Sequence, residues 1–148
     1  MGHGGGSLSD PGCPFCGIAG GRIPARIVRR TRLSVSFLDA SPLARGHVLA
    51  VPSSHRERIQ DMTEEECSDL FGLVRSLASG TDSIHGSTLV AVHNGPGAGQ
   101  EVPHVHVHLV PRRDGDGAGP VHSMFGAADP GADDPDEVCR LVGKESLP

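Results

Sequence analysis

The stretch that decides the fold is HNGPGAGQEVPHVHVHLVPRR, residues 93–113. Within it, residues 102–111 alternate between two kinds of side chain, the period-two pattern of a β-strand. Because successive side chains of a strand point to opposite faces, one face should present valines and leucine to a core. The opposite face then carries three imidazoles, those of His104, His106 and His108.

This row of imidazoles needs an explanation, because a buried polar ring costs desolvation free energy unless it finds a partner. Three alternatives are open: a solvent-exposed strand face, a histidine-rich metal patch, and a functional site. A remnant purification tag fits poorly, since the histidines alternate with β-branched valines in the middle of the chain. We interpret the row as a functional site.

The glycine-rich loop NGPGAGQ, residues 94–100, ends four residues before the first of these histidines. Its unobstructed backbone N–H groups could form a nest for a phosphate, although such a loop is also an ordinary strand connection. A neutral imidazole can attack a phosphate held there, provided that a backbone carbonyl accepts the hydrogen of its other nitrogen. A neighbouring imidazole can stabilise the phosphate charge or protonate a leaving group.

The remaining patterns predict an α+β domain. A short helical turn is expected at residues 13–21 and a long helix at 63–79, where Thr63 and Glu66 fit a capping box and Gly80 can end the helix. Further strands are expected at 26–39, 47–52 and 87–94. Short connections between neighbouring strands favour an antiparallel sheet.

Length and composition limit the domain organisation. A chain of 148 residues suits one domain with its own core. We expect a flexible N-terminal tail at residues 1–12, the folded domain at 13–113, and a mobile linker with a short C-terminal segment at 114–148. The last segment is rich in Gly, Asp and Pro, and a short helix is expected near 135–144.

Charge and hydropathy exclude several classes of partner. The formal net charge is −5 and no basic stripe accompanies it, which argues against binding duplex nucleic acid. No apolar run reaches the 18 residues that a membrane-spanning helix needs. The glycine-rich start of the chain lacks the apolar core of a signal peptide, so we expect a cytoplasmic protein with reduced thiols.

The closely spaced pair Cys13 and Cys16 admits three interpretations. A redox-active pair requires a preceding strand and a following helix, but here a glycine-rich tail precedes the pair. Two cysteines at this spacing are half of a tetrahedral zinc site, for which the chain would have to supply two more ligands. Two plain thiols are the third alternative. Cys67 fits a small buried apolar residue of the long helix.

The segment 93–113 resembles the sequence pattern of the histidine-triad (HIT) family, close to its Fhit-like and bacterial members. The resemblance extends upstream to residues 45–55 (RGHVLAVPSSH), 37–42 (FLDASP) and 13–25 (CPFCGIAGGRIPA). It implies a HIT-like fold: an antiparallel sheet of about five strands, one long helix and a short N-terminal helix.

The resemblance also implies a two-step mechanism. His106 would be the nucleophile that takes up a nucleoside monophosphate, and His108 would contact the phosphate. Gln100 would orient the leaving group or the water that releases the nucleotide. The expected substrates are nucleoside phosphoramidates or dinucleoside polyphosphates, with a purine nucleotide, adenosine above all, as the transferred part.

Further binding residues follow from the same resemblance. Asn94 would touch the phosphate or ribose, the backbone of Gly99 and Glu101 would cradle phosphate, and Asp39 would bind the ribose hydroxyls. The base pocket would be lined by Phe15, Ile18, Phe37 and Leu38. For these four side chains plain core packing is an equal alternative. Glu101 departs from the Ser or Thr found in Hint-like members, and its carboxylate is unfavourable near phosphate unless it points away.

The resemblance implies a structural zinc held by Cys13, Cys16, His55 and His104, and a homodimer. His47 is expected to be structural. The other histidines, His3, His85, His93 and His122, are expected in surface or loop positions. A nucleotide-binding interaction module with little turnover is the alternative to the enzyme. A zinc or thiol-redox protein is a third hypothesis, which the missing strand–helix context of the cysteine pair disfavours.

Overall fold

The computed structural model describes residues 8–145. The chain forms two compact units, divided after Asp114. The first unit contains a five-stranded sheet, in the order β1-β2-β3-β5-β4. Its elements are α1 (Pro14–Ala19), β1 (Ile27–Arg30), β2 (Ser34–Leu38), β3 (Val48–Pro52), α2 (Glu64–His85), β4 (Ser87–Val92) and β5 (Val107–Arg112). Every neighbouring pair of strands is antiparallel, so the predicted α+β class, sheet and short first helix are confirmed.

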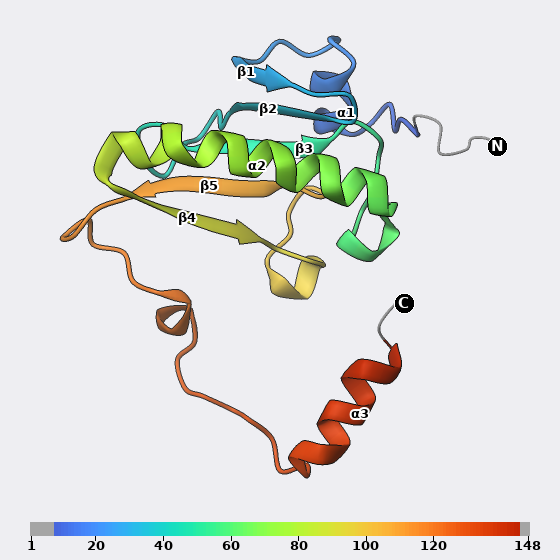
Figure 1. Ribbon diagram of the computed structural model, residues 1–148, viewed down its shortest axis with the longest axis vertical. Helices are drawn as coiled ribbons and strands as arrows, with labels where there is room; N and C mark the ends of the chain where they lie inside the picture. Colours follow the sequence, from blue (N-terminus) through green and yellow to red (C-terminus); the bar gives the residue numbers. More distant parts are fainter. Residues whose placement is uncertain (1–7, 146–148) are drawn as a thin grey trace. The chain divides into compact units, whose positions relative to one another are not determined.

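The two faces of the sheet bury different clusters, because alternate residues of β3 point to opposite sides. Val48 and Ala50 pack with Val107, Leu109 and the apolar stripe of α2, and Figure 1 shows this helix lying over β3 and β5. Leu49 and Val51 face the other way. There they join a second cluster formed by Val35, Phe37, Phe15, Cys13 and Cys16. The helix α1 therefore covers the face opposite α2.

The long helix is longer than the sequence pattern predicts. Its N-terminus is as expected, with the Thr63 side chain accepting from Glu66 N and the Glu66 side chain accepting from Thr63 N. Gly80 does not end it, however, and α2 continues to His85. A glycine inside a helix costs only about 1 kcal/mol, and Thr81, one turn before the end, is buried. Gly86, at φ 104°, supplies the left-handed cap instead.

The histidine segment is less regular than a single strand. β5 begins at Val107, so only His108 of the three histidines lies in the ladder, and the prediction of one strand over 102–111 is wrong in its first half. The ladder stops because the preceding backbone is held elsewhere: Val105 N donates to Arg56 O over 2.7 Å. The alternation of faces persists nevertheless, since Val105, Val107 and Leu109 pack in the cluster beneath α2, whereas His106 and His108 line the opposite face.

The chain on either side of these elements adds a backbone contact before α1 and a second compact unit after β5. Of the predicted N-terminal tail, residues 1–7 lie outside the described residues, whereas Leu8 O accepts a hydrogen bond of 2.7 Å from His55 N. The second unit contains a 3-10 turn (Val121–Met124) and the helix α3 (Pro135–Glu145), close to the helix expected at 135–144. Within residues 8–145, no helix is long and apolar enough to cross a membrane.

Candidate functional site

A cavity of about 1370 Å³ opens on the sheet face opposite α2. One end is apolar and is formed by α1, by the segment that follows α1, and by side chains of β2 and β3. Its side chains are Phe15, Ile18, Ile23, Phe37, Leu38 and Leu49. The other end is polar and is lined by Asp39, His47, His93, Glu101, His106 and His108, together with Gly99. The cavity thus combines an apolar pocket with a concentration of imidazoles.

His106 has the orientation that a nucleophilic imidazole needs. Its Nδ1 lies 2.8 Å from the carbonyl oxygen of His104, to which it donates its hydrogen. The lone pair then lies on Nε2, as the sequence argument required. Burial is the main cause that lowers the pKa of His106, so the ring is held neutral.

His108 is held in the opposite tautomer by a short chain of hydrogen bonds. Leu43 N donates to His47 Nδ1 over 3.0 Å, so the hydrogen of the neutral His47 ring is on Nε2. This Nε2 lies 3.0 Å from His108 Nδ1 and donates to it, which leaves a hydrogen on His108 Nε2. Burial, followed by the neighbouring histidines, lowers the pKa of His108 to about 4. His108 therefore enters the site as a neutral N–H donor, suited to a phosphate oxygen.

His47, expected to be structural, lines the cavity and is hydrogen-bonded to His108. Asp39, whose Oδ2 lies 3.5 Å from His47 Nε2, completes a group of three side chains close enough to surround a metal ion. The hydrogen bond from Leu43 N speaks against a metal there, because it requires an unprotonated Nδ1 and so a protonated Nε2. We interpret Leu43 N, His47 and His108 as a hydrogen-bonded chain that orients His108, with the Asp39 carboxylate beside it.

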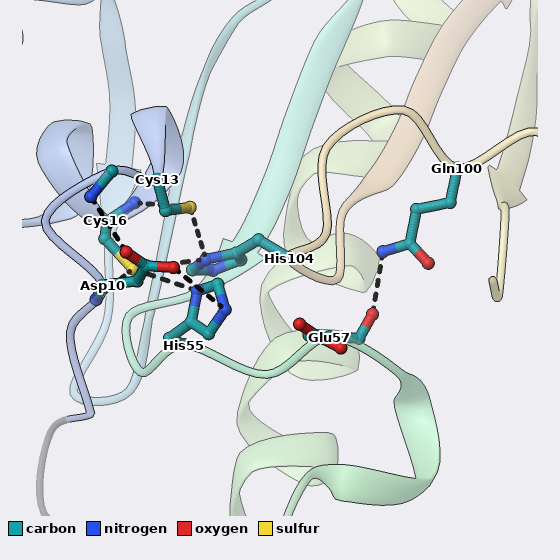
Figure 2. Close-up of polar contacts among 8 residues, drawn as sticks. Asp10, Cys13, Cys16, His55, Glu57, Gln100 and His104 are labelled. Atoms are coloured by element: carbon teal, nitrogen blue, oxygen red, sulfur yellow. Dashed lines mark hydrogen bonds and ion pairs between the residues drawn. The ribbon is translucent and has the colours of Figure 1, made fainter. Parts of the chain in front are cut away.

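Two cysteines and two histidines meet at a second cluster, beside the first. Cys13 Sγ lies 3.4 Å from His104 Nδ1, and Cys16 Sγ lies 3.4 Å from His55 Nδ1 and 3.5 Å from His104 Nδ1. Figure 2 shows these four side chains converging from α1, the loop after β3, and the segment before β5. The fold therefore brings together the four residues that the family resemblance implies as ligands.

This cluster fits a tetrahedral zinc ion. Zinc–sulfur and zinc–nitrogen bonds of usual length place S and N ligands about 3.6 Å apart, close to the separations found here. His104 Nε2 donates to Pro52 O over 2.8 Å, so its Nδ1 lone pair faces the sulfurs. Cys16 N donates to Cys13 Sγ, and Asp10 N donates to Cys16 Sγ, as expected around thiolate ligands. Burial raises the pKa of the Cys13 thiol, a cost that metal binding would offset.

Two predicted site residues lie away from the cavity. The Gln100 side chain accepts from Gly95 N over 2.7 Å and donates to Glu57 O over 2.8 Å, the second contact being drawn in Figure 2. The Asn94 side chain accepts from Ile59 N and donates to Gln60. The Gln100 amide therefore closes the glycine-rich loop upon itself, and both amides tie it to the segment after β3. Neither side chain lines the cavity.

His93 is the site residue that the sequence argument missed. It follows β4, whose last ladder pair joins Val92 to Val107 of β5. Continuing this register by one residue sets His93 opposite His106. The His93 ring lines the cavity and lies 5.4 Å, between ring centroids, from His108. Strands were expected at 87–94 and 102–111, but only their pairing and its register would have revealed that His93 lies opposite His106.

Comparison with known proteins agrees with this architecture. The HIT domain family matches residues 20–115. The adenosine 5′-monophosphoramidase hnt1 of Schizosaccharomyces pombe is 36% identical over 102 residues, which are 68% of this chain and 74% of that protein. A bis(5′-nucleosyl)-tetraphosphatase of the same organism is 35% identical over 96 residues, which are 64% of this chain and only 53% of that protein.

A solved structure shows the same fold. A zinc-bound histidine triad family protein from Mycobacterium smegmatis superposes with a TM-score of 0.68 and 29% identity, covering 88% of this chain and 90% of that one.

Proposed function

Because the chain belongs to the HIT domain family, we propose that it is a nucleotide hydrolase that transfers a nucleoside monophosphate to His106 and then to water. The single observation that carries this proposal is the hydrogen bond of 2.8 Å between His106 Nδ1 and the carbonyl oxygen of His104. It leaves the Nε2 lone pair free on a neutral ring, which is the form of imidazole that attacks phosphorus.

The proposed substrates are nucleoside phosphoramidates and dinucleoside polyphosphates with an adenosine nucleotide as the transferred part. The names of the two yeast relatives support both classes, one being an adenosine 5′-monophosphoramidase and the other a bis(5′-nucleosyl)-tetraphosphatase. The apolar end of the cavity suits a purine base, since flat aromatic surfaces are buried favourably there. Phe15 and Phe37, with ring centroids 5.6 Å apart, would form its walls with Ile18 and Leu38.

The phosphate and ribose would lie where the cavity becomes polar. His108 donates from Nε2 to a phosphate oxygen, and the backbone of Gly99 and Glu101 borders the same space. Asp39, between the apolar end and the imidazoles, would accept from the ribose hydroxyls. Asn94 and Gln100 would act indirectly: their side chains hold the glycine-rich loop in shape, in place of the direct contacts expected from the sequence.

The test of the nucleophile uses one variant and two measurements. His106→Ala should abolish release of AMP from adenosine 5′-phosphoramidate, while AMP itself still binds in a calorimetric titration. Unchanged turnover would remove His106 as the nucleophile. If the wild-type protein binds AMP but turns over neither substrate class, the alternative of a nucleotide-binding interaction module would replace the enzyme.

We further propose that Cys13, Cys16, His55 and His104 hold one structural zinc ion. With four protein ligands the ion would keep no open position for substrate. Its role would be to fix the segment that carries His104 and His106 against α1. Metal analysis of untreated protein should give about one equivalent per chain, and Cys13→Ser should lose most of it. Cys67→Ser is the control for a thiol outside the cluster, and full zinc retention in Cys13→Ser would exclude this ligand set.

The cytoplasmic location and the homodimer expected from the sequence stay predictions. Light scattering of the purified protein would test the dimer.

A further inference from the structure

We propose that His93 is a catalytic acid and base of the same reaction: it protonates the leaving group when His106 attacks and takes a proton from water when the nucleotide is released. This inference rests on the proposed function. It concerns a residue at the end of β4, outside the alternating row of histidines.

The strand order places His93 on the side of the cavity that the nucleoside leaves empty. β5 lies between β3 and β4 in the sheet. The side chains proposed to hold base and ribose, such as Phe37 and Asp39, come from β2 and the residue after it, on the β3 side of the reacting imidazole. His93 comes from the β4 side. In an in-line displacement the leaving group lies opposite His106 Nε2, and with the nucleoside directed towards β2 the cavity wall beside it on the other side is the one that carries His93.

The His93 ring is available for proton transfer. Among residues 8–145, no protein group hydrogen-bonds to either of its nitrogens, and its ring contact is with His108. His47, His106 and His108 differ in this respect, because each has a ring nitrogen committed to a protein partner. The ring is half-buried at the cavity wall. Imidazole is the side chain best suited to exchange protons near neutral pH.

The two steps balance with this assignment. In the first, the Nε2 lone pair of His106 forms a bond to phosphorus, and the bond from phosphorus to the leaving group breaks. The leaving group keeps that electron pair and receives the proton of the His93 imidazolium. In the second, water attacks phosphorus and gives a proton to neutral His93, and the phosphorus–nitrogen pair returns to His106. The products are the protonated leaving group and the nucleoside monophosphate, and both histidines regain their starting forms.

The test compares leaving groups of different basicity in His93→Gln, which keeps a hydrogen-bonding side chain but transfers no proton. The substrates are aryl and alkyl esters of AMP, from 4-nitrophenyl to ethyl. A 4-nitrophenolate departs without a proton, so its single-turnover release should fall at most about threefold. For the ethyl ester, release should fall by about 10²–10⁴-fold, the usual worth of a general acid. His85→Gln, an exposed histidine at the end of α2, should match the wild type throughout.

The outcomes separate this inference from the proposed function. The inference is overturned if the release rate of His93→Gln falls by the same factor with every leaving group, or if the variant keeps full activity with the ethyl ester. In either case His93 is not the general acid. If His106→Ala retains turnover, the proposed function itself fails. AMP affinity and the urea midpoint of His93→Gln show whether the variant is folded. Should it not fold, the same esters are compared in His93→Asn and His93→Ala. A loss of release rate that grows with the basicity of the leaving group, in either variant, supports the inference.

Discussion

Replacing Glu66 by glutamine should remove a large part of the free energy of unfolding, although the new side chain is nearly isosteric. Arg56 Nε lies 3.0 Å and Arg56 Nη2 3.3 Å from the two carboxylate oxygens of Glu66. The exposed fractions of the Arg56 and Glu66 side chains are only 12% and 7%. Glu66 also accepts from Thr63 N over 2.8 Å. One carboxylate thus serves a buried ion pair and the N-terminal cap of α2.

The glutamine variant separates these two roles. A glutamine can still serve the capping box, so the cap survives. Its amide N–H₂ would face a guanidinium donor, however, and the Arg56 charge would stay buried without a counter-ion. Breaking a buried pair from one side costs about 3–5 kcal/mol. Because one hydrogen bond from Arg56 remains, we expect about 3 kcal/mol for Glu66→Gln. Glu66→Ala, which also loses the cap, should cost about 1 kcal/mol more.

Urea denaturation at pH 7 measures these changes. Glu64→Gln is the matched control, since Glu64 is an exposed residue of the same helical turn, and it should change the free energy of unfolding by less than about 0.5 kcal/mol. If Glu66→Gln costs no more than this control, the argument from the buried ion pair is refuted.

A pH series adds a second check. Burial raises the pKa of Glu66, but hydrogen bonds and charge from Thr63 and Arg56 outweigh it and hold the pKa below the ordinary 4.5. A group with a lowered pKa stabilises the fold above its unfolded pKa and loses that contribution as the pH falls through its folded value. The difference between wild type and Glu66→Gln should therefore be constant from pH 6 to 8 and shrink below pH 4.5. A difference independent of pH would contradict the charge-based explanation.

Three further changes have defined outcomes. Gly95→Ala should cost about 1–3 kcal/mol in urea titrations, because φ is +105°, a backbone conformation that strains any residue with a Cβ. Gly97→Ala, which has open space, should be nearly neutral. His47→Leu, which has no donor for His108 Nδ1, should lower kcat about tenfold with little change in KM, since such a hydrogen bond is worth about 1.4 kcal/mol; an unchanged kcat would contradict this. Glu101→Gln should raise turnover of a dinucleoside polyphosphate relative to a phosphoramidate at low ionic strength only, and a salt-independent ratio would argue against charge repulsion.

The sequence predicted best what depends on local patterns. Alternation gave the buried set Val105, Val107 and Leu109, and the capping box located the start of α2. The cysteine spacing and the family resemblance together selected four residues that meet in the fold. Each of these inferences depends on a periodicity or a spacing along the sequence, which is the same in the folded and the unfolded chain.

Contacts between distant segments were not accessible to the same reasoning. Gln100 and Asn94 look like ligands of the site when only the glycine-rich loop is considered. In the fold, the loop after β3 supplies partners for both amides, and these partners lie more than 30 residues away along the chain. His93 was missed for the converse reason, because only the register between β4 and β5 sets it opposite His106. Strand register depends on tertiary packing and turn geometry.

His104 links the two clusters through a single residue. Its ring lies against the sulfur of Cys13, while its backbone carbonyl holds the ring of His106. For protein engineering, position 104 is therefore a shared constraint: the proposed metal centre and the proposed nucleophile cannot be optimised separately. A new ligand at this position that moved the backbone by about 1 Å would misalign the attacking nitrogen, a displacement that can cost about 10²-fold in rate, even if zinc were still bound tightly.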